Sequence, residues 1–181
     1  MKKWMFISVV GLQMVFLLAV AGFIQAKINS GQVVVLKVVP VDPRSLFMGN
    51  YMDLRYDISS VDLAKVPHSD KAELFTSYKV VYVTLQPDEK GARVANVGLS
   101  PPTDGSLYMR GQIQWKTEST LNLIYGIERY YIPEVREEEV NQMGWDPDGQ
   151  DLPKITVEVS VARDGTAYLL RVLKDGKPLD F

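Results

Sequence analysis

Four charged residues in two separate segments have the types expected of an ion-pair network. Asp42 and Arg44 lie in the stretch PVDPRSLFMGNYMDLRYDI. Glu128 and Arg129 lie in the later stretch YGIERYYIPE. Because the planar guanidinium group of arginine suits bidentate pairing with a carboxylate, we expect these side chains to tie the two segments together. Docking of a partner on the same residues and catalysis by them are the alternatives.

A serine–lysine dyad is the sharpest enzymatic hypothesis. Ser45 lies in the proline-rich stretch, and Lys79 begins a predicted strand. Such a dyad needs a desolvated lysine, because only the neutral amine accepts the serine proton. The layout DPRSLFMGNYMDL is similar to the nucleophile region of type I signal peptidases, but Val41 occupies the place of the nucleophilic serine. The simpler interpretation is that Ser45 caps a turn and Lys79 is solvated at a strand edge.

Other catalytic and cofactor chemistry has little support in the composition. The chain has no cysteine and one histidine, His68, so thiolate metal sites are excluded and a histidine-based site would depend on one residue. The 20 basic and 22 acidic residues are interspersed, which disfavours nucleic-acid binding. An aspartate-rich loop at residues 144–154 lacks the terminal glutamate of a calcium loop. We therefore expect no cofactor and no metal.

Aromatic residues offer a third functional class, a β-domain that binds a small ligand. Trp115, Tyr125, Tyr130 and Tyr131 could line a pocket between strands. Aromatic residues that alternate along strands more often form the core and cross-strand pairs. An enclosed apolar pocket would distinguish the ligand-binding class from the others.

The elements that position these residues begin with an apolar N-terminal segment. Residues 4–26 contain Ser8, Gln13 and Gln25 as their polar side chains, and about 20 apolar residues in a helix cross the hydrocarbon core. The segment therefore predicts a transmembrane anchor over residues 1–26, followed by a separate domain over residues 27–181.

Charge and length predict the orientation of this anchor. Lys2 and Lys3 precede the apolar run, which favours a cytoplasmic N-terminus and an extracytoplasmic domain in the inner or plasma membrane. The alternative is a signal peptide cleaved after the A-x-A triplet at residues 19–21. We favour an uncleaved, single-pass anchor because the apolar run continues beyond that triplet through Phe23 and Ile24.

The rest of the chain has the period of β-strands. In MDLRYDI (residues 52–58), apolar and charged residues alternate strictly, as in a half-buried strand. Asp164-Gly165 separates two alternating runs and predicts a hairpin, and a second Asp-Gly pair follows at residues 175–176. Further strands are expected at residues 32–39, 79–86, 92–100, 107–115, 120–132 with a break near Gly126, 155–162 and 166–174.

Two short segments have helical signals. Residues 69–78 offer Asp70 as an N-cap with Glu73 three positions later, and residues 133–144 run from a proline to a glycine. Many strands with so little helix leave no room for parallel crossovers. We predict a mainly β fold, an antiparallel β-barrel or sandwich with one or two short helices, preceded by a single transmembrane helix.

Four segments in order resemble the bacterial GDYXXLXY family. GNYMDLRY (residues 49–56) is similar to the motif that names the family, and PVDPRSLFMG, YGIERYYIPE and RDGTA are similar to its other segments. The resemblance covers most of the chain beyond the anchor. It implies a membrane-anchored protein of uncharacterised function, often encoded beside multi-span membrane proteins.

One position departs from the family and bears on mechanism. Asn50 stands where the family motif has Asp, and asparagine neither takes up a proton near neutral pH nor supplies negative charge. Both residues cap turns, so the change keeps the corner and loses the acid. Gly49 permits a strained turn, and Tyr51 and Tyr56 can bury their rings while their hydroxyls find partners.

These observations favour a non-enzymatic accessory or interaction protein that partners a multi-span membrane protein. An exposed face with Tyr131, Ile132 and Pro133 would suit docking, because aromatic side chains carry much of the energy of protein interfaces. The bilayer contacts residues 4–26, and the anchor confines the domain to the plane of its partner. The peptidase and the small-ligand binder remain the alternatives.

Overall fold

The computed structural model describes residues 2–39, 51–88, 91–131 and 155–179 of the 181-residue chain. A long helix, α1 (Lys2–Ser30), leads into a domain of antiparallel strands. Two short 3-10 helices are η1 (Asp57–Ser59) and η2 (Ala72–Leu74). The strands are β1 (Gln32–Lys37), β2 (Tyr51–Asp53), β3 (Ser60–Asp62), β4 (Val80–Gln86), β5 (Arg93–Gly98), β6 (Tyr108–Lys116), β7 (Thr120–Ile124), β8 (Arg129–Tyr131), β9 (Ile155–Val161), β10 (Ala167–Lys174) and β11 (Lys177–Pro178).

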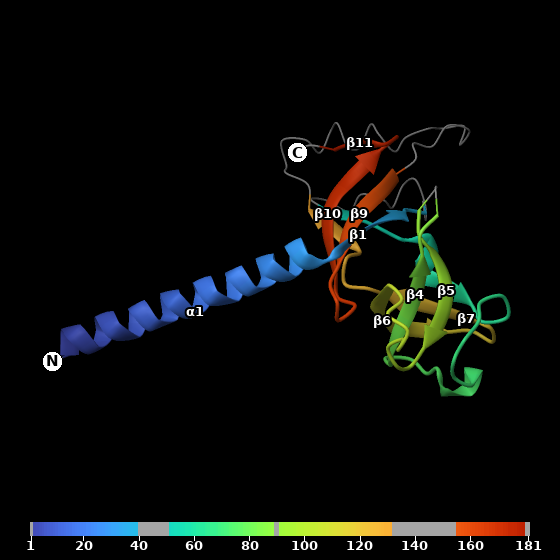
Figure 1. Ribbon diagram of the computed structural model, residues 1–181, viewed down its shortest axis with the longest axis horizontal. Helices are drawn as coiled ribbons and strands as arrows, with labels where there is room; N and C mark the ends of the chain where they lie inside the picture. The colour runs from blue at the N-terminus through green and yellow to red at the C-terminus, as the bar shows by residue number, and fades with distance from the viewer. Residues whose placement is uncertain (1, 40–50, 89–90, 132–154, 180–181) are drawn as a thin grey trace.

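The strands form two principal sheets and one short ladder. One sheet has the order β1-β9-β10-β11 and the other has the order β3-β7-β6-β4-β5, while β2 pairs with β8. Together they make a nearly closed, barrel-like sheet, which confirms the predicted mainly β fold. Figure 1 shows α1 extending away from the domain, with the four-stranded sheet beside the end of the helix and the five-stranded sheet beyond it.

The core lies between the two sheets and is built from alternate residues of their strands. Val34 and Leu36 of β1 are buried while Val33 and Val35 are exposed, which is the alternation that one buried face requires. The same pattern recurs in β4 and β6. The largest fully buried side chains are Phe75, Leu36, Leu54, Ile58, Met109, Ile113, Leu121, Val61, Val81, Val83 and Val97.

Both Asp-Gly pairs occur in hairpin loops, although a hairpin was predicted only at Asp164-Gly165, and the two loops differ in geometry. Between β10 and β11, Asp175 and Gly176 both have positive φ, at 49° and 80°, as a two-residue type I′ turn demands. Between β9 and β10, positive φ occurs at Gly165 (77°) and not at Asp164. There the Ala162 amide donates to the Thr166 carbonyl across a longer loop.

The alternating stretch at residues 52–58 is not one continuous strand. Leu54, Tyr56 and Ile58 are buried, as alternation predicts. However, β2 ends at Asp53, and the chain passes through η1 before it enters the five-stranded sheet as β3. The stretch therefore joins two sheets, and periodicity alone cannot indicate this change of partner.

The predicted helix at residues 69–78 is also wrong. The structure has only the three residues of η2 there, and Asp70 makes no capping bond. Its Oδ2 instead accepts a hydrogen bond from the Leu99 amide at 2.7 Å, so a tertiary contact replaces the local one. The predicted helix at residues 133–144 and the loop at residues 144–154 lie outside the described residues.

The N-terminal helix is long and apolar enough to cross a membrane. Its apolar side chains from Trp4 to Ile24 are exposed. The helix continues past the apolar run through Lys27 to Ser30, and only Gly31 separates it from β1. The anchor segment and the β-domain are therefore joined without a linker.

Candidate functional site

The two motif segments lie side by side as an antiparallel pair of strands. In the ladder of β2 and β8, Tyr51 pairs with Tyr131 and Asp53 with Arg129. The pairing continues past β2, where the Leu54 amide donates to the Glu128 carbonyl at 2.7 Å. Backbone hydrogen bonds, and not only charged side chains, therefore join the segments.

Two buried tyrosines form hydrogen bonds between the segments that flank this ladder and the neighbouring backbone. The Tyr56 hydroxyl donates to the Ile127 carbonyl at 2.5 Å, and the Tyr125 hydroxyl donates to the Ile58 carbonyl at 2.7 Å. Burial raises the pKa of both phenols far above the usual value, and a nearby glutamate, Glu128, raises it further. Both hydroxyls therefore stay protonated and act as structural donors.

The side chain of Glu128 accepts hydrogen bonds from the backbone of its own turn. Its Oε1 accepts a hydrogen bond from the Tyr125 amide at 2.5 Å, and its Oε2 accepts one from the Gly126 amide at 2.8 Å. Gly126 has a φ of 84°, a conformation that glycine adopts readily. The carboxylate thus stabilises the corner between β7 and β8, a role that sequence reasoning did not assign to it.

The remaining predicted site residues are described by the structure to different extents. Asp42, Arg44, Ser45, Gly49 and Asn50 lie outside the described residues. Of Tyr51 the structure describes the backbone, which pairs with β8. Tyr131 has 72% of its side chain exposed, as the docking hypothesis requires, and Arg129 is exposed beside it.

Lys79 does not have the surroundings of a desolvated base. It is exposed, and its Nζ donates a hydrogen bond to the Leu74 carbonyl at 3.0 Å. This geometry favours the interpretation of Lys79 as a solvated residue beside a strand.

A groove of about 910 Å³ opens where the motif ladder meets the five-stranded sheet. Its volume lies in the range typical of ligand sites. Its walls combine Val39 beyond the end of β1, residues of and next to the β2–β8 ladder, and residues of β3, β6 and β7. The lining residues are Val39, Asp53, Leu54, Arg55, Tyr56, Asp57, Ser59, Ser60, Gln114, Asn122, Leu123, Ile124, Gly126, Glu128, Arg129 and Tyr131.

Two groove residues that the sequence did not single out carry buried polar atoms. Asp57 Oδ1 and Ser59 Oγ are buried and have no hydrogen-bond partner in the described part of the chain. Burial raises the pKa of Asp57, and the positive charge of Lys37 opposes that shift. No pattern in the sequence distinguishes Asp57 from its exposed neighbours Asp53 and Arg55, because alternation places all three on the polar face.

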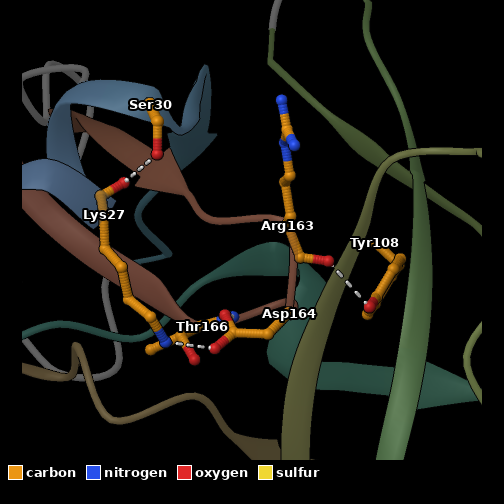
Figure 2. A network of polar contacts seen from close by, with 6 residues as sticks. All are labelled: Lys27, Ser30, Tyr108, Arg163, Asp164 and Thr166. Carbon is orange, nitrogen blue, oxygen red and sulfur yellow. Dashed lines mark hydrogen bonds and ion pairs between the residues drawn. The ribbon is translucent and has the colours of Figure 1, made fainter.

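A second polar cluster joins α1 to the domain (Figure 2). Figure 2 shows Lys27 beside Asp164, with Lys27 Nζ 2.5 Å from Asp164 Oδ2. The Ser160 hydroxyl also donates to the Ile28 carbonyl at 2.6 Å. The bond from Lys27 lowers the pKa of Asp164 to about 2. A Cβ at Gly31 would lie 2.1 Å from Ser160 Oγ, so a larger residue there would displace the Ser160 hydroxyl from its bond to Ile28.

The same hairpin packs against the five-stranded sheet. The Tyr108 hydroxyl donates to the Arg163 carbonyl at 3.0 Å, and the Arg110 amide donates to the Gly165 carbonyl at 2.8 Å. A Cβ at Gly165 would lie 2.6 Å from the Tyr108 ring. The segment RDGTA therefore contacts α1 through Asp164 and the five-stranded sheet through Arg163 and Gly165. The Tyr108 ring leaves little room for a side chain at Gly165.

The geometry fits no metal centre in the described residues, where no group of three or more His, Asp or Glu residues converges. Of the four aromatic candidates, Tyr131 lines the groove, whereas Tyr125 is buried with its hydroxyl bound to a carbonyl. Trp115 is 44% exposed on the outside of β6. Tyr130 is half-buried against the core. The aromatic residues therefore do not form one shared pocket.

The comparison with known proteins agrees with the motif segments. The chain matches the GDYXXLXY protein family over residues 13–172. That range includes most of α1, the β2–β8 ladder, the groove and the RDGTA hairpin. No match was found among curated proteins or among solved structures. The extent of the family match shows that this chain belongs to the GDYXXLXY protein family.

Proposed function

We propose that this protein is a membrane-anchored, non-enzymatic accessory protein that binds a multi-span membrane protein through its β-domain. The observation that carries this proposal is the direct docking of α1 on the domain. The helix exposes an apolar surface along its length, and its last turn contacts β9 through Ile28 and Ser160. Such a helix is stabilised by lipid, because exposure of so much apolar surface to water is unfavourable.

The contact between α1 and the β-domain determines how the domain is oriented relative to the membrane. A flexible linker would let the domain sample many orientations and distances from the bilayer. Here one residue, Gly31, separates α1 from β1, and the Lys27–Asp164 ion pair holds the hairpin against the helix. The domain therefore keeps one face close to the membrane, where a membrane-embedded partner is already confined to the same plane.

The groove supports binding more than catalysis. Its motif tyrosine Tyr56 and its Glu128 are engaged in hydrogen bonds to backbone groups, so neither is available as a nucleophile or a base. The exposed ring of Tyr131 stands at its wall, and large aromatic side chains contribute strongly to interfaces. A binding surface at this groove is the function that these contacts favour.

The proposed topology follows from charge. Lys2 and Lys3 precede the apolar run and favour a cytoplasmic N-terminus. The β-domain would then lie outside the cytoplasm, attached to the inner or plasma membrane by a single, uncleaved span. The apolar run continues beyond the A-x-A triplet through Phe23 and Ile24, and this supports retention of the helix.

The test is isolation of the full-length, tagged protein from its native membrane in mild detergent, with companions identified by mass spectrometry. We expect one multi-span membrane protein in near-stoichiometric amount, and its loss when Tyr131 is changed to Asp. Tyr78→Asp is the matched control, because Tyr78 is 77% exposed and does not line the groove. A protein that is isolated alone, or a partner lost equally from both variants, would contradict the proposal.

A further inference from the structure

The edge of the five-stranded sheet opens into the groove. β3 is the outermost strand, and within the described residues β7 is its one neighbour in the sheet. Ser60, the first residue of β3, lines the groove and is exposed. An exposed strand edge presents backbone donors and acceptors that can pair with another extended chain.

The register shows which backbone groups point into the groove. The Leu63 amide donates to the Ser119 carbonyl at 2.7 Å, and the register then places Val61 opposite Leu121 and Ser60 opposite Asn122. In an antiparallel pair, hydrogen-bonded and non-hydrogen-bonded positions alternate. Val61 therefore bonds to β7, while the N–H and C=O groups of Ser60 point away from it.

Neutral polar side chains lie on β7 and β6, on the face of the sheet beside this edge. Ser60 is opposite Asn122 on β7, and Asn122 lies next to Gln114, the bulged residue of β6. Hydroxyl and amide side chains supply both donors and acceptors without charge. On the other wall, Asp53 and Arg55 are exposed, so the groove offers both signs of charge as well as neutral partners.

We propose that an extended peptide segment of the membrane-protein partner lies in this groove and pairs with the free edge of β3 at Ser60. The inference rests on the accessory function proposed above and names the part of the partner that is bound. Main-chain pairing would supply affinity, and the Asn122 and Gln114 amides on the adjoining face of the sheet would bond to side chains of the peptide that lie over that face. A lipid chain would leave these polar groups unpaired, and a sugar lacks the in-register N–H and C=O groups of a strand.

The first test places a photo-crosslinking amino acid, benzoylphenylalanine, at position 60 and irradiates native membranes. We expect a crosslink to a peptide from an extramembrane segment of the same multi-span protein that co-purifies with the wild-type chain. The control position is Lys177, which is exposed on the opposite sheet and should give no such product. A crosslink to glycan or lipid in place of peptide would overturn the inference.

The second test separates the backbone of Ser60 from its side chain. Ser60→Pro removes the N–H that points into the groove, whereas Ser60→Ala keeps it. Loss of one such hydrogen bond should reduce the amount of bound partner about fivefold for the proline variant. The alanine variant should bind within about twofold of wild type, because its backbone edge is unchanged.

A third variant covers the case in which Ser60→Pro fails to fold. Gln114 is exposed, so Gln114→Trp should leave the core intact and fill the groove, which should remove the partner by at least about tenfold. If folded groove variants retain the partner at the wild-type level, the inference is wrong while the accessory function stands. If no multi-span protein accompanies the wild-type chain, both are wrong.

Discussion

The α1 junction and the β2–β8 ladder join segments of the chain in opposite ways. At the junction, Lys27 and Asp164 form an ion pair in which the side chains are 32% and 46% exposed. Beside the ladder, Tyr56 and Tyr125 donate hydrogen bonds from within the core, with 2% and 8% exposure. Exposed ion pairs contribute little to stability, whereas an unmade buried hydrogen bond is costly.

This difference separates positioning from stability. The ladder holds the motif segments against the barrel, so its loss should unfold the site. The ion pair orients the hairpin beside the helix, while the close contact of Gly165 with Tyr108 is what packs that hairpin on the domain. The comparison therefore predicts that the glycine, and not the charges, matters most for stability at the junction.

The largest expected effect comes from Gly165→Ala. The new methyl group would meet the Tyr108 ring at 2.6 Å in a residue whose φ is 77°, so we expect a loss of about 3 kcal/mol in the free energy of unfolding. Gly105→Ala is the matched control, since Gly105 also has a φ of 77° but no atom within 4 Å of the added Cβ. It should lose only about 1 kcal/mol.

Denaturant unfolding of the full chain in detergent micelles, followed by tryptophan fluorescence, measures this pair of variants. Equal losses in the two would mean that Tyr108 moves aside readily. In that case the junction would not depend on close packing, and the contrast between the two regions would rest on the tyrosines alone.

The second effect in size is that of Tyr125→Phe. The change leaves the Ile58 carbonyl without its donor in the core, which should cost about 2 kcal/mol in the free energy of unfolding. Tyr108→Phe removes a hydroxyl bond of similar kind that is exposed, to the Arg163 carbonyl, and should cost less than about 1 kcal/mol. Thermal unfolding of both variants tests the ranking, and a larger loss for Tyr108→Phe would reverse it.

A smaller effect is expected for Glu128. Glu128→Ala leaves the amides of Tyr125 and Gly126 without their acceptor and should cost about 1 kcal/mol, because water can partly replace the carboxylate. Glu128→Gln retains one acceptor oxygen and should lie between Ala and wild type. Amide hydrogen exchange at Gly126 should speed up in the same order, and unchanged exchange in Glu128→Ala would show that the carboxylate does not protect the turn.

The smallest expected effect on stability is that of the Lys27–Asp164 ion pair, and this effect depends on pH. Lys27 lowers the pKa of Asp164 from 3.8 to about 2, so the pair favours the folded state above pH 3.8 and loses this contribution as the pH falls towards 2. Carboxyl NMR should give this low pKa for Asp164 in the wild type and a higher pKa in Lys27→Ala, where the Thr166 amide still donates to the carboxylate. Asp164→Asn should melt near the wild-type temperature at neutral pH, and a large drop would show that the junction does depend on charge.

Local sequence signals anticipated most elements but not their partners. Strand positions followed from alternation, and both Asp-Gly loops followed from the freedom of glycine to take positive φ. Two predictions were wrong. Asp70 does not begin a helix, because its side chain bonds to the Leu99 amide, and residues 52–58 do not form one strand, because this stretch passes from one sheet to another. In both places a contact distant in sequence overrode a local preference.

The candidate site was anticipated in part. The sequence predicted a charge network between the two motif segments, and Asp42 and Arg44 of that network lie outside the described residues. The structure joins the segments through the backbone of the β2–β8 ladder, which the sequence did not predict. We expected the carboxylate of Glu128 to form an ion pair with an arginine, but it accepts hydrogen bonds from two backbone amides. Ser60 and Gln114 carried no signal, because a free strand edge and a bulge arise only when strands are assembled.

The sequence by itself determined the apolar helix, the half-buried strands, the turn glycines and the family to which the chain belongs. These depend on composition and on periods of a few residues, which the chain carries locally. The tertiary structure decided that the helix docks on β9 without a linker, that two tyrosines close the motif corner, and that the groove opens beside β3. Each of these joins residues distant along the chain, and only the packed barrel brings their hydrogen-bonding groups together.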